Sequence, residues 1–427
     1  MPSGRQSDSG SFDLTSLPRR AFLKQSAAVA GMAVVGSGLV TGSAVAQGRR
    51  IGPNDRISIG VIGCGGRGSA LMEDIRAVAK DRNAEITAVC DVWKVNLNAA
   101  AAKAKEWFGK QPRTSTRFGD VLALPDVDAV VIATPDFGHT PIMIAALKAG
   151  KDVYVEKPMS MEISGANEAL DLARNNERVV QVGTQRRSEG RFKGAAKEFA
   201  GGILGKLNRI SAAVNVNHAR WARAYNDCKP SDVDWDAFLF NRPKRPFDPS
   251  LLRQWHFYKL CTNGLSGLWM AHYSDSVHMV TGSKYPTSAV AHGGLYVWKD
   301  GREHTDTFHA LLDYPEGFLM SWGMGLGNAS GTHFTLHGTE ATMDLEKWTV
   351  SGDGGVGVKE LPAREIKAEP SESHMGNWLD CIRSRQRPNA DIQYGHQHAV
   401  ATIMAAAALE TGRKHFYDVQ KREMRAV

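Results

Sequence analysis

The stretch Arg56-Ile57-Ser58-Ile59-Gly60-Val61-Ile62-Gly63-Cys64-Gly65-Gly66-Arg67-Gly68 decides the fold of the first half of this chain. Residues 56–62 form an apolar, β-branched run that predicts a buried strand. Glycines at 63, 65 and 68 follow in G-x-G-x-x-G spacing, and residues 69–80 have a helical pattern. The sequence therefore predicts a strand, a glycine-rich turn and a helix in direct succession.

This unit is typical of a dinucleotide site, because each glycine has a separate physical task. Gly63 allows the tight turn, Gly65 lets main-chain N–H groups approach a pyrophosphate, and Gly68 lets the helix pack closely on the strand. The positive end of the helix dipole then faces the phosphates.

A second predicted strand, residues 84–90, ends at Asp91. Its carboxylate is expected to accept hydrogen bonds from the hydroxyls of the adenosine ribose. The next residues, Val92 and Trp93, include no arginine that could neutralise a 2′-phosphate. These features favour NAD over NADP as the cofactor.

Strand and helix patterns continue to alternate after Asp91. Residues 127–133 predict a strand, 134–139 its exit loop, 140–150 a helix and 151–155 another strand. Such alternation indicates a parallel sheet, with ligand-binding groups at the carboxyl ends of its strands.

At this point the chain resembles the Gfo/Idh/MocA family, the group of glucose–fructose oxidoreductase and inositol dehydrogenase. The matching features, besides the glycine turn, are Thr134-Pro135-x-x-x-His139, Ala149-Gly150-Lys151, Glu156-Lys157-Pro158, residues 182–187 and residues 374–391. The resemblance implies an α/β protein: an N-terminal Rossmann domain, then an α/β domain with a large, mostly antiparallel open sheet. The inner face of that sheet would carry the substrate site, and its outer face would form a homodimer or homotetramer.

The predicted boundaries are a Rossmann NAD-binding domain at 56–180 and a substrate-binding and oligomerisation domain at 181–427. The expected cofactor contacts lie in the glycine turn and at the carboxyl ends of strands. They are Gly63, Cys64, Gly65, Gly66, Arg67, Gly68, Asp91, Thr134, Pro135, His139, Glu156, Lys157 and Gln185.

The second half changes to longer polar–apolar alternations, which predict strands of a sheet with one buried face. These alternations occupy residues 210–216, 288–297, 307–314, 318–323 and 333–338. A tryptophan-rich segment, residues 221–269, separates the first two. Its aromatic rings could pack on the apolar faces of a sugar, or they could simply pack the loop itself.

Residues 264–278 stand where the family carries its catalytic helix. The family pattern is Gly-Gly, a few residues, Asp, three residues and then His; His272 matches the histidine, whereas Leu268 stands at the position of the acid. We expect His272 to act as the base for a sugar hydroxyl, because imidazole titrates near neutral pH. Lys157 would stabilise the developing alkoxide.

Asp275, one helical turn after His272, could replace the missing acid or orient a ligand hydroxyl. The spacing of His272, Asp275 and His278 also admits a metal, but we predict none, because these residues spread over about a third of the helix circumference. The expected substrate contacts are Arg186, Arg187, Trp255, His256, His272 and Asp275. For the two arginines, surface ion pairing is an alternative.

The N-terminus predicts an export signal. Arg19-Arg20-Ala21-Phe22-Leu23-Lys24 resembles a twin-arginine motif, an apolar stretch spans residues 27–40, and Ala44-Val45-Ala46 is a small-x-small cleavage site. We therefore expect a signal peptide at 1–46, a linker at 47–55 and a mature protein in the periplasm without a membrane anchor; an uncleaved anchor is the alternative. Twin-arginine export, by resemblance, implies a protein folded around its cofactor before transport.

Composition narrows the remaining choices. The 427 residues carry 52 Lys and Arg against 45 Asp and Glu, a formal net charge of +7 spread along the chain, so no nucleic-acid partner is predicted. Five widely spaced cysteines form neither a zinc pattern nor a full disulfide framework and are expected to be mostly reduced core residues.

Three functions remain open on the sequence. The first is an oxidoreductase that transfers hydride between a tightly bound nicotinamide cofactor and a sugar or sugar derivative. The second is a redox-neutral NAD-dependent glycosidase that oxidises, eliminates, hydrates and reduces. The third is a sugar-binding protein without catalysis, for which Lys157→Ala and His272→Ala would change no activity.

Overall fold

A computed structural model describes residues 51–52, 55–352 and 360–427 of the chain. The expected signal peptide and most of the expected linker lie outside these residues. All five cysteines are buried and free of disulfides, as the sequence predicts.

The first sheet is parallel and has six strands in the order β3-β2-β1-β4-β5-β6, which confirms the predicted Rossmann-like domain. Its strands are β1 (Ile57–Ile62), β2 (Ala84–Cys90), β3 (Arg113–Ser115), β4 (Ala129–Ile132), β5 (Asp152–Val155) and β6 (Val180–Val182). Its helices are α1 (Gly66–Ala79), α2 (Lys94–Phe108), α3 (Phe118–Leu122), α4 (Asp136–Lys148) and α5 (Ile163–Asn175).

Every residue of β1 is buried, which explains its continuous apolar sequence. Helix α1 begins at Gly66, inside the glycine turn and three residues before the predicted start. The turn and the first helical residues are therefore one structure at the carboxyl end of β1.

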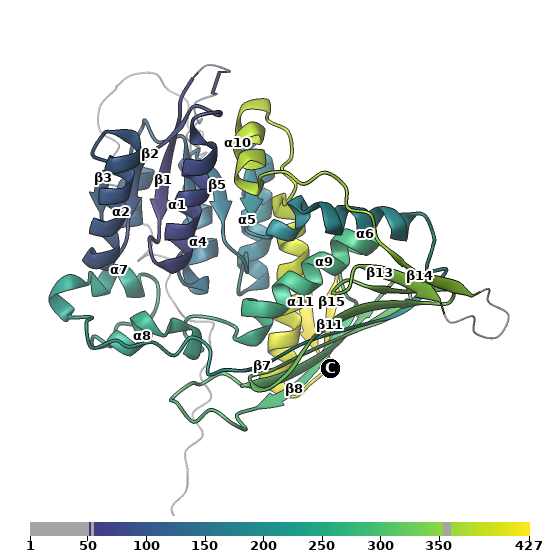
Figure 1. Ribbon diagram of the computed structural model, residues 1–427. Coiled ribbons are helices and arrows are strands. Elements are labelled where there is room, and N and C mark those ends of the chain that lie inside the picture. The colour runs from purple at the N-terminus through teal and green to yellow at the C-terminus, as the bar shows by residue number, and fades with distance from the viewer. Residues whose placement is uncertain (1–50, 53–54, 353–359) are drawn as a thin grey trace, which may run out of the picture. The chain divides into compact units, whose positions relative to one another are not determined.

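Helix α10 (His374–Ser384) lies late in the sequence but belongs to the core of the first sheet. Its Trp378 and Ile382 are fully buried and join the apolar cluster of Ile57 and Ile75. Figure 1 shows α10 beside the helices of the N-terminal sheet. A helix from the C-terminal part of the sequence thus completes the core of the first sheet, so no single sequence boundary separates the residues that pack on the two sheets.

The second sheet has ten strands in the order β14-β13-β12-β11-β7-β10-β9-β8-β15-β16. Only β7 and β10 pair in parallel, so the sheet is mostly antiparallel, as predicted. Its strands are β7 (Leu207–Asn217), β8 (Ser288–Gly294), β9 (Thr307–Tyr314), β10 (Phe318–Gly325), β11 (Gly327–Gly338), β12 (Thr342–Asp344), β13 (Thr349–Gly352), β14 (Leu361–Glu365), β15 (His415–Asp418) and β16 (Glu423–Ala426).

Strand β8 stops three residues before its predicted end, and Asp306 provides the reason. The main-chain N–H groups of Val297 and Trp298 donate to its carboxylate at 2.7 and 2.8 Å. These bonds replace the ladder hydrogen bonds that would have extended the strand.

Helices cover one face of the second sheet. They are α6 (Gly190–Ala200), α9 (Ala271–Thr281) and α11 (Ile392–Thr411), which share one apolar cluster with the inward-facing side chains of the strands. Strand β9 alternates strictly between buried and outward residues, as a sheet covered on one face requires. None of the helices in the described ranges combines the length and apolar character that crossing a membrane requires.

The tryptophan-rich segment between β7 and β8 contains the short helices α7 (Trp235–Leu239) and α8 (Pro249–Arg253). Phe238 packs edge-on against Phe137 of α4, with ring centroids 5.7 Å apart. Val233 of the segment shares a small apolar cluster with Trp93. The segment is therefore held against the ligand-binding edge of the first sheet.

Candidate active site

A cavity of about 590 Å³ lies where three parts of the chain meet. The first sheet contributes the glycine turn and the exit loops of its strands, and the loop after β7 together with the tryptophan-rich segment contributes residues from Arg220 to His256. The third contribution is Leu268, Trp269 and His272, at the start of α9. Eleven of the thirteen predicted cofactor residues line this cavity: Gly63, Gly65, Gly66, Arg67, Asp91, Thr134, Pro135, His139, Glu156, Lys157 and Gln185.

The glycine turn has the close contacts that a dinucleotide site requires. Gly63 has φ +85°, and a Cβ there would lie 2.7 Å from the main chain of Ala133. A Cβ on Gly68 would lie 1.8 Å from the carbonyl oxygen of Gly63. Gly68 does not line the cavity. Its missing Cβ allows α1 to pack closely on the turn, which is the role predicted for it from the sequence.

Cys64, the other predicted cofactor contact outside the cavity lining, is buried beneath the turn. Its Sγ lies 3.4 Å from the carbonyl oxygen of Cys90, while its main-chain N–H donates to Asp91 at 2.7 Å. Only its main chain therefore contributes to the site.

The Asp91 carboxylate is fixed by the main chain at the edge of the cavity. It accepts N–H bonds from Cys64 at 2.7 Å and Trp93 at 2.9 Å. Burial raises the pKa of Asp91, and these main-chain donors act in the opposite direction. Oδ2 also accepts a long hydrogen bond from the Asn96 amide at 3.4 Å, whereas Oδ1 accepts only from Trp93 and can accept another bond, so the arrangement fits a ribose hydroxyl of a dinucleotide.

Glu156 organises the next part of the wall. Its carboxylate accepts from Arg67 Nε at 2.7 Å and from Gln185 Nε2 at 3.3 Å. The Gln185 amide also donates to the hydroxyl of Tyr154 at 3.0 Å. Three predicted cofactor residues from separate elements are thus joined, and the charge of Glu156 is paired.

His139 connects two strand-exit loops. Its Nδ1 lies 2.8 Å from the carbonyl oxygen of Pro158, and its Nε2 lies 2.9 Å from that of Thr134. The ring therefore positions the loop that carries Lys157.

Lys157 binds the main chain at the position of the missing acid. Its Nζ donates to the carbonyl oxygen of Leu268 at 2.7 Å. Leu268 lies in a π-helical turn, Ser266–Met270, directly before α9. Such turns interrupt the regular helical ladder and recur at functional sites. The Lys157 ammonium is thus held by a main-chain carbonyl, while the side chain at this position is apolar.

His272 follows this turn and lines the same cavity. Burial, then the charges of Lys157 and Arg186, hold the pKa of His272 well below its usual range. Burial likewise lowers the pKa of Lys157, while the carboxylates of Asp136 and Glu156 oppose that shift. The imidazole is therefore neutral at neutral pH with its lone pair free, and the same shift makes it a weaker base than the near-neutral titration expected from the sequence.

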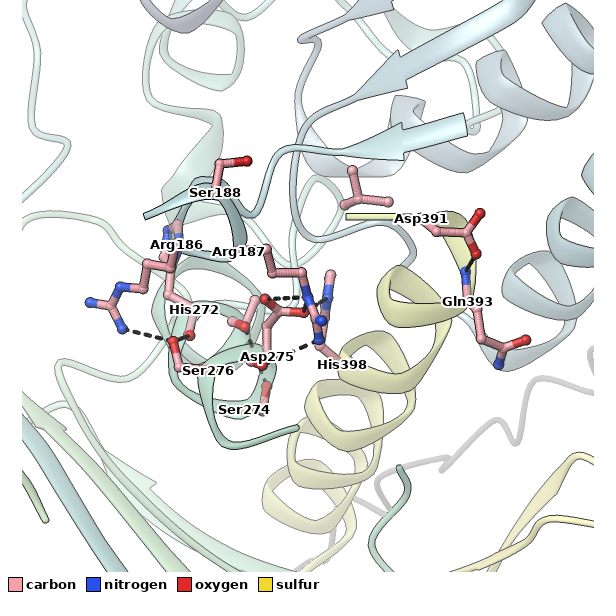
Figure 2. Close-up of polar contacts among 12 residues, drawn as sticks. Arg186, Arg187, Ser188, His272, Ser274, Asp275, Ser276, Asp391, Gln393 and His398 are labelled. Carbon is pink, nitrogen blue, oxygen red and sulfur yellow. Dashed lines mark hydrogen bonds and ion pairs between the residues drawn. The ribbon is translucent and has the colours of Figure 1, made fainter. Parts of the chain in front are cut away.

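Asp275 is placed differently from the prediction, because it does not line the cavity. Its carboxylate, 1% exposed, pairs with Arg187 Nε at 2.8 Å, and His398 Nδ1 of α11 lies 3.7 Å away. Figure 2 shows Asp275 directed toward these two residues. Although burial alone would raise it, the charges of Arg187 and His398 hold the pKa of Asp275 at about 2. It has the environment of a structural ion pair.

The two predicted substrate arginines also lie outside the cavity lining. Arg187 is committed to Asp275, and its guanidinium group lies 3.9 Å from the ring centroid of Tyr394. Arg186 donates to Ser276 Oγ at 3.3 Å and packs over the ring of Tyr273. Trp255, His256 and His272, the other predicted substrate contacts, do line the cavity.

The structure adds cavity residues that the sequence did not indicate. Asp136, at the start of α4, is 2% exposed and accepts a hydrogen bond from Thr262 Oγ1 at 2.7 Å. Arg253 lies 4.4 Å from the ring centroid of Trp93, near Asp91. Further cationic and aromatic side chains in the lining include Arg220, Trp221, Arg223 and Trp269. Apart from the tryptophan richness of the segment, no local pattern marked them.

Comparison with known proteins supports a dinucleotide-binding fold in the first half of the chain. Residues 57–184 match the oxidoreductase family described by its NAD-binding Rossmann fold. The chain is 33% identical over 173 residues to a glycosyl hydrolase family 109 protein of Solibacter usitatus, covering 38% of this chain and 37% of that protein. It is 28% identical over 177 residues to an inositol 2-dehydrogenase/D-chiro-inositol 3-dehydrogenase of Lactiplantibacillus plantarum, covering 41% and 46%. The chain thus spans less than half the length of these curated relatives.

A solved structure extends the likeness to the second sheet. The WlbA dehydrogenase of Bordetella pertussis, crystallised with NADH and UDP-GlcNAcA, superposes with a TM-score of 0.63 at 20% identity. The match covers 84% of this chain and 98% of that one, so the two-domain fold is shared. Together with the geometry of the glycine turn and of Asp91, these matches show that residues 57–184 are similar to the NAD-binding Rossmann fold of the Gfo/Idh/MocA oxidoreductases.

Proposed function

We propose that the protein transfers hydride between a tightly bound nicotinamide dinucleotide and a sugar or sugar derivative. One observation carries the proposal: Lys157 and His272 line the same cavity as the glycine turn and Asp91. A proton-accepting group and a cationic donor therefore face the space next to the dinucleotide site. This is the combination that oxidation of an alcohol requires.

When bound, the nicotinamide ring accepts or returns the hydride of a carbinol carbon. His272 takes the hydroxyl proton, because its lowered pKa leaves the imidazole neutral. Lys157 uses one N–H on the carbonyl of Leu268, which fixes Nζ, and its other N–H groups are free to stabilise alkoxide charge. Ionised Asp136 raises the pKa of Lys157 and so helps to keep this amine protonated; burial raises the pKa of Asp136, and the charge of Lys157 acts in the opposite direction.

NAD is the proposed cofactor, because the buried Asp91 carboxylate would repel a 2′-phosphate and suits free ribose hydroxyls. Arg253, which packs over the ring of Trp93 and lines the cavity, is a cation that would favour NADP. Its Nη2 lies 3.7 Å from Asp227, which offsets its charge.

The proposed location is the periplasm, reached in the folded state. The support is the twin-arginine motif within residues 1–46. Because free nicotinamide nucleotides are not expected there, a released cofactor could not readily be replaced. The redox cycle would then close on the protein, with one sugar oxidised and another reduced. A homodimer or homotetramer through the outer face of the ten-stranded sheet belongs to the same proposal.

The experiment is to purify the mature protein without added nucleotide, denature it, and quantify NAD(H) and NADP(H) by mass spectrometry. Near-stoichiometric NAD(H) is expected. The same preparation is then offered pairs of sugars, one oxidised and one reduced. Lys157→Met should retain the nucleotide and lose turnover. An empty protein that shows no hydride transfer with added NAD would overturn the proposal.

A second function, NAD-dependent glycoside cleavage, is favoured by the relative named glycosyl hydrolase family 109 protein. In that cycle a hydroxyl is oxidised to a ketone, the neighbouring C–H bond becomes acidic, the glycosidic group leaves, water adds, and the hydride returns. Exchange of the proton at carbon 2 of the sugar with D₂O distinguishes the two functions, because only elimination requires it.

A further inference from the structure

Arg220 and Arg223 bring positive charge to the part of the cavity that the dinucleotide site does not explain. Both line the cavity and belong to the loop that leaves β7. The guanidinium group of Arg220 lies 4.7 Å from the ring centroid of Trp269, whose chain neighbour Leu268 binds Lys157. Arg223 is close enough to His256 to lower its pKa.

The loop is held through its main chain, which leaves both side chains available. Arg302 Nη2 donates to the carbonyl oxygen of Ala219 at 3.0 Å, and Gln254 Nε2 donates to that of Arg223 at 2.6 Å. Arg302 is itself fixed by its ion pair with Asp300 at 2.6 Å. The guanidinium groups of Arg220 and Arg223 are therefore not needed as anchors.

Trp221, between the two arginines in sequence, adopts an unfavourable backbone conformation. Its φ of +67° is rare for a bulky residue and is retained where the surroundings impose it. Its ring stacks on His256 at a centroid distance of 5.2 Å, and His256 stacks in turn on Trp255 at 3.7 Å. The loop is thus built so that its arginines border a flat, aromatic wall.

The described part of the chain provides no counterion for this positive charge. Neither Arg220 nor Arg223 has an ion-pair partner among the described residues, and Arg220 Nε is buried without a hydrogen bond. Burial, with the charge of Arg253, lowers the pKa of Arg223. The acidic residues of the cavity are already engaged: Asp91 by main-chain N–H groups, Glu156 by Arg67, and Asp136 by Thr262.

We propose that the substrate carries an anionic substituent, a carboxylate or a phosphate, which binds to Arg220 and Arg223 while its ring packs on the Trp221–His256–Trp255 wall. A neutral sugar would leave the half-buried Arg220, whose Nε has no hydrogen-bond partner, without a charge partner, which is unfavourable, while the exposed Arg223 adds positive charge at the rim. An oxyanion satisfies several of their N–H donors at once. The inference rests on the proposed function, since it assigns a substrate class to that same site.

The test compares D-glucuronate, D-glucose 6-phosphate and D-glucose, which differ at carbon 6 only, by calorimetric titration of the full protein with its own nucleotide. At least one acidic sugar should bind about tenfold or more tightly than glucose, and Arg220→Gln and Arg223→Gln should each remove most of that preference. The two acidic probes distinguish a carboxylate from a phosphate. Arg209→Gln, on an exposed position of β7, is the matched control and should change nothing.

Three results would overturn the inference: both acids bind no better than glucose, the preference survives in the Arg220→Gln/Arg223→Gln double variant, or Arg223→Gln loses the bound nucleotide. The last would mean that Arg223 serves the cofactor. The proposed function is judged separately, by hydride transfer and its loss in Lys157→Met. If the protein oxidises neutral sugars only, the proposed function is retained and the proposal of a site for an anionic substituent is rejected.

Discussion

Lys157 is held by the main chain at a position where the sequence pattern of related proteins has an acid. Leu268 stands at the position of the acid, yet its carbonyl oxygen receives the Lys157 ammonium at 2.7 Å. A carbonyl dipole offsets less charge than a carboxylate, so the remaining support comes from Asp136 and Glu156. Because Glu156 is paired with Arg67, Asp136 is the more available of the two.

Asp136→Asn should therefore shift the alkaline limb of the pH–rate profile to lower pH. Burial already lowers the pKa of Lys157, and Asp136 raises it, so removal of that negative charge lowers the pKa further. The ammonium is then lost at a lower pH. The measurement is kcat/KM for hydride transfer against pH. Thr262→Val removes the hydrogen bond to Asp136 but keeps the charge, and should leave the limb in place. An unchanged limb in Asp136→Asn would contradict this role.

Asp275→Asn should destabilise the protein without abolishing catalysis. The change leaves Arg187, 6% exposed at its side chain, buried without a carboxylate, which costs about 3–5 kcal/mol of unfolding free energy. Measured on folded protein at low temperature, kcat should stay within a few fold. A loss of about a hundredfold or more with unchanged stability would show instead that Asp275 takes part in proton transfer.

At the scale of elements, the turn between β1 and α1 contains two glycines that differ in the space available for a side chain. A Cβ on Gly68 would lie 1.8 Å from the carbonyl oxygen of Gly63, whereas a Cβ on Gly66 would meet nothing within 4 Å. Both residues belong to the first turn of α1.

Gly68→Ala should lower the unfolding free energy of nucleotide-free protein by about 1–3 kcal/mol or more, because helix and turn must separate. Gly66→Ala is the matched control and should cause no loss, since alanine is favoured over glycine in a helix. Urea unfolding of the two variants provides the measurement. Equal midpoints would mean that α1 does not need this close approach.

The sequence predicted those elements for which hydrophobic pattern, turn residues and neighbouring segments all indicate the same secondary structure. Residues 56–80 combine an apolar run, a glycine turn and a helical pattern, so strand, turn and helix were all found. Short edge strands such as β16 (Glu423–Ala426) have too few residues for an alternation to stand out, and their pairing with β15 is what creates them. Helix α10 was not assigned to the first sheet because that packing is a tertiary contact between distant parts of the chain.

The same limit applies to the site. Lys157 and His272 follow recognisable motifs, and both line the cavity. His272 and Asp275 are separated by about 60° on a helical wheel. The sequence therefore could not show whether Asp275 faces the cavity, as His272 does, or the protein interior. Its side chain turned toward Arg187 and α11, elements remote in sequence. Arg220 and Arg223 lie in an irregular loop, where no periodicity reveals which side chains face a cavity.

At the scale of the whole molecule, buried histidines connect the packing of the second domain to pH. Burial lowers the pKa of His278 to about 3 and that of His396 to about 4. Both are almost fully buried, at 4% and 1% exposure. In the unfolded chain a histidine titrates near about 6.5. Between these values the unfolded state binds protons that the folded state does not, so acid favours unfolding.

The free energy of unfolding should therefore be full above pH about 6.5 and fall as the pH drops below it, by about 1.4 kcal/mol per pH unit for each such histidine. His278→Gln should make this decline shallower by about that amount between pH 6.5 and 5, a window above most carboxylate titration. Urea unfolding at pH 7, 6 and 5 measures the slope. His292→Gln, at an exposed position of β8, should leave the slope unchanged. A slope that His278→Gln does not alter would show that the folded protein admits a proton at His278, and hence that the packing around α9 opens well above pH 5.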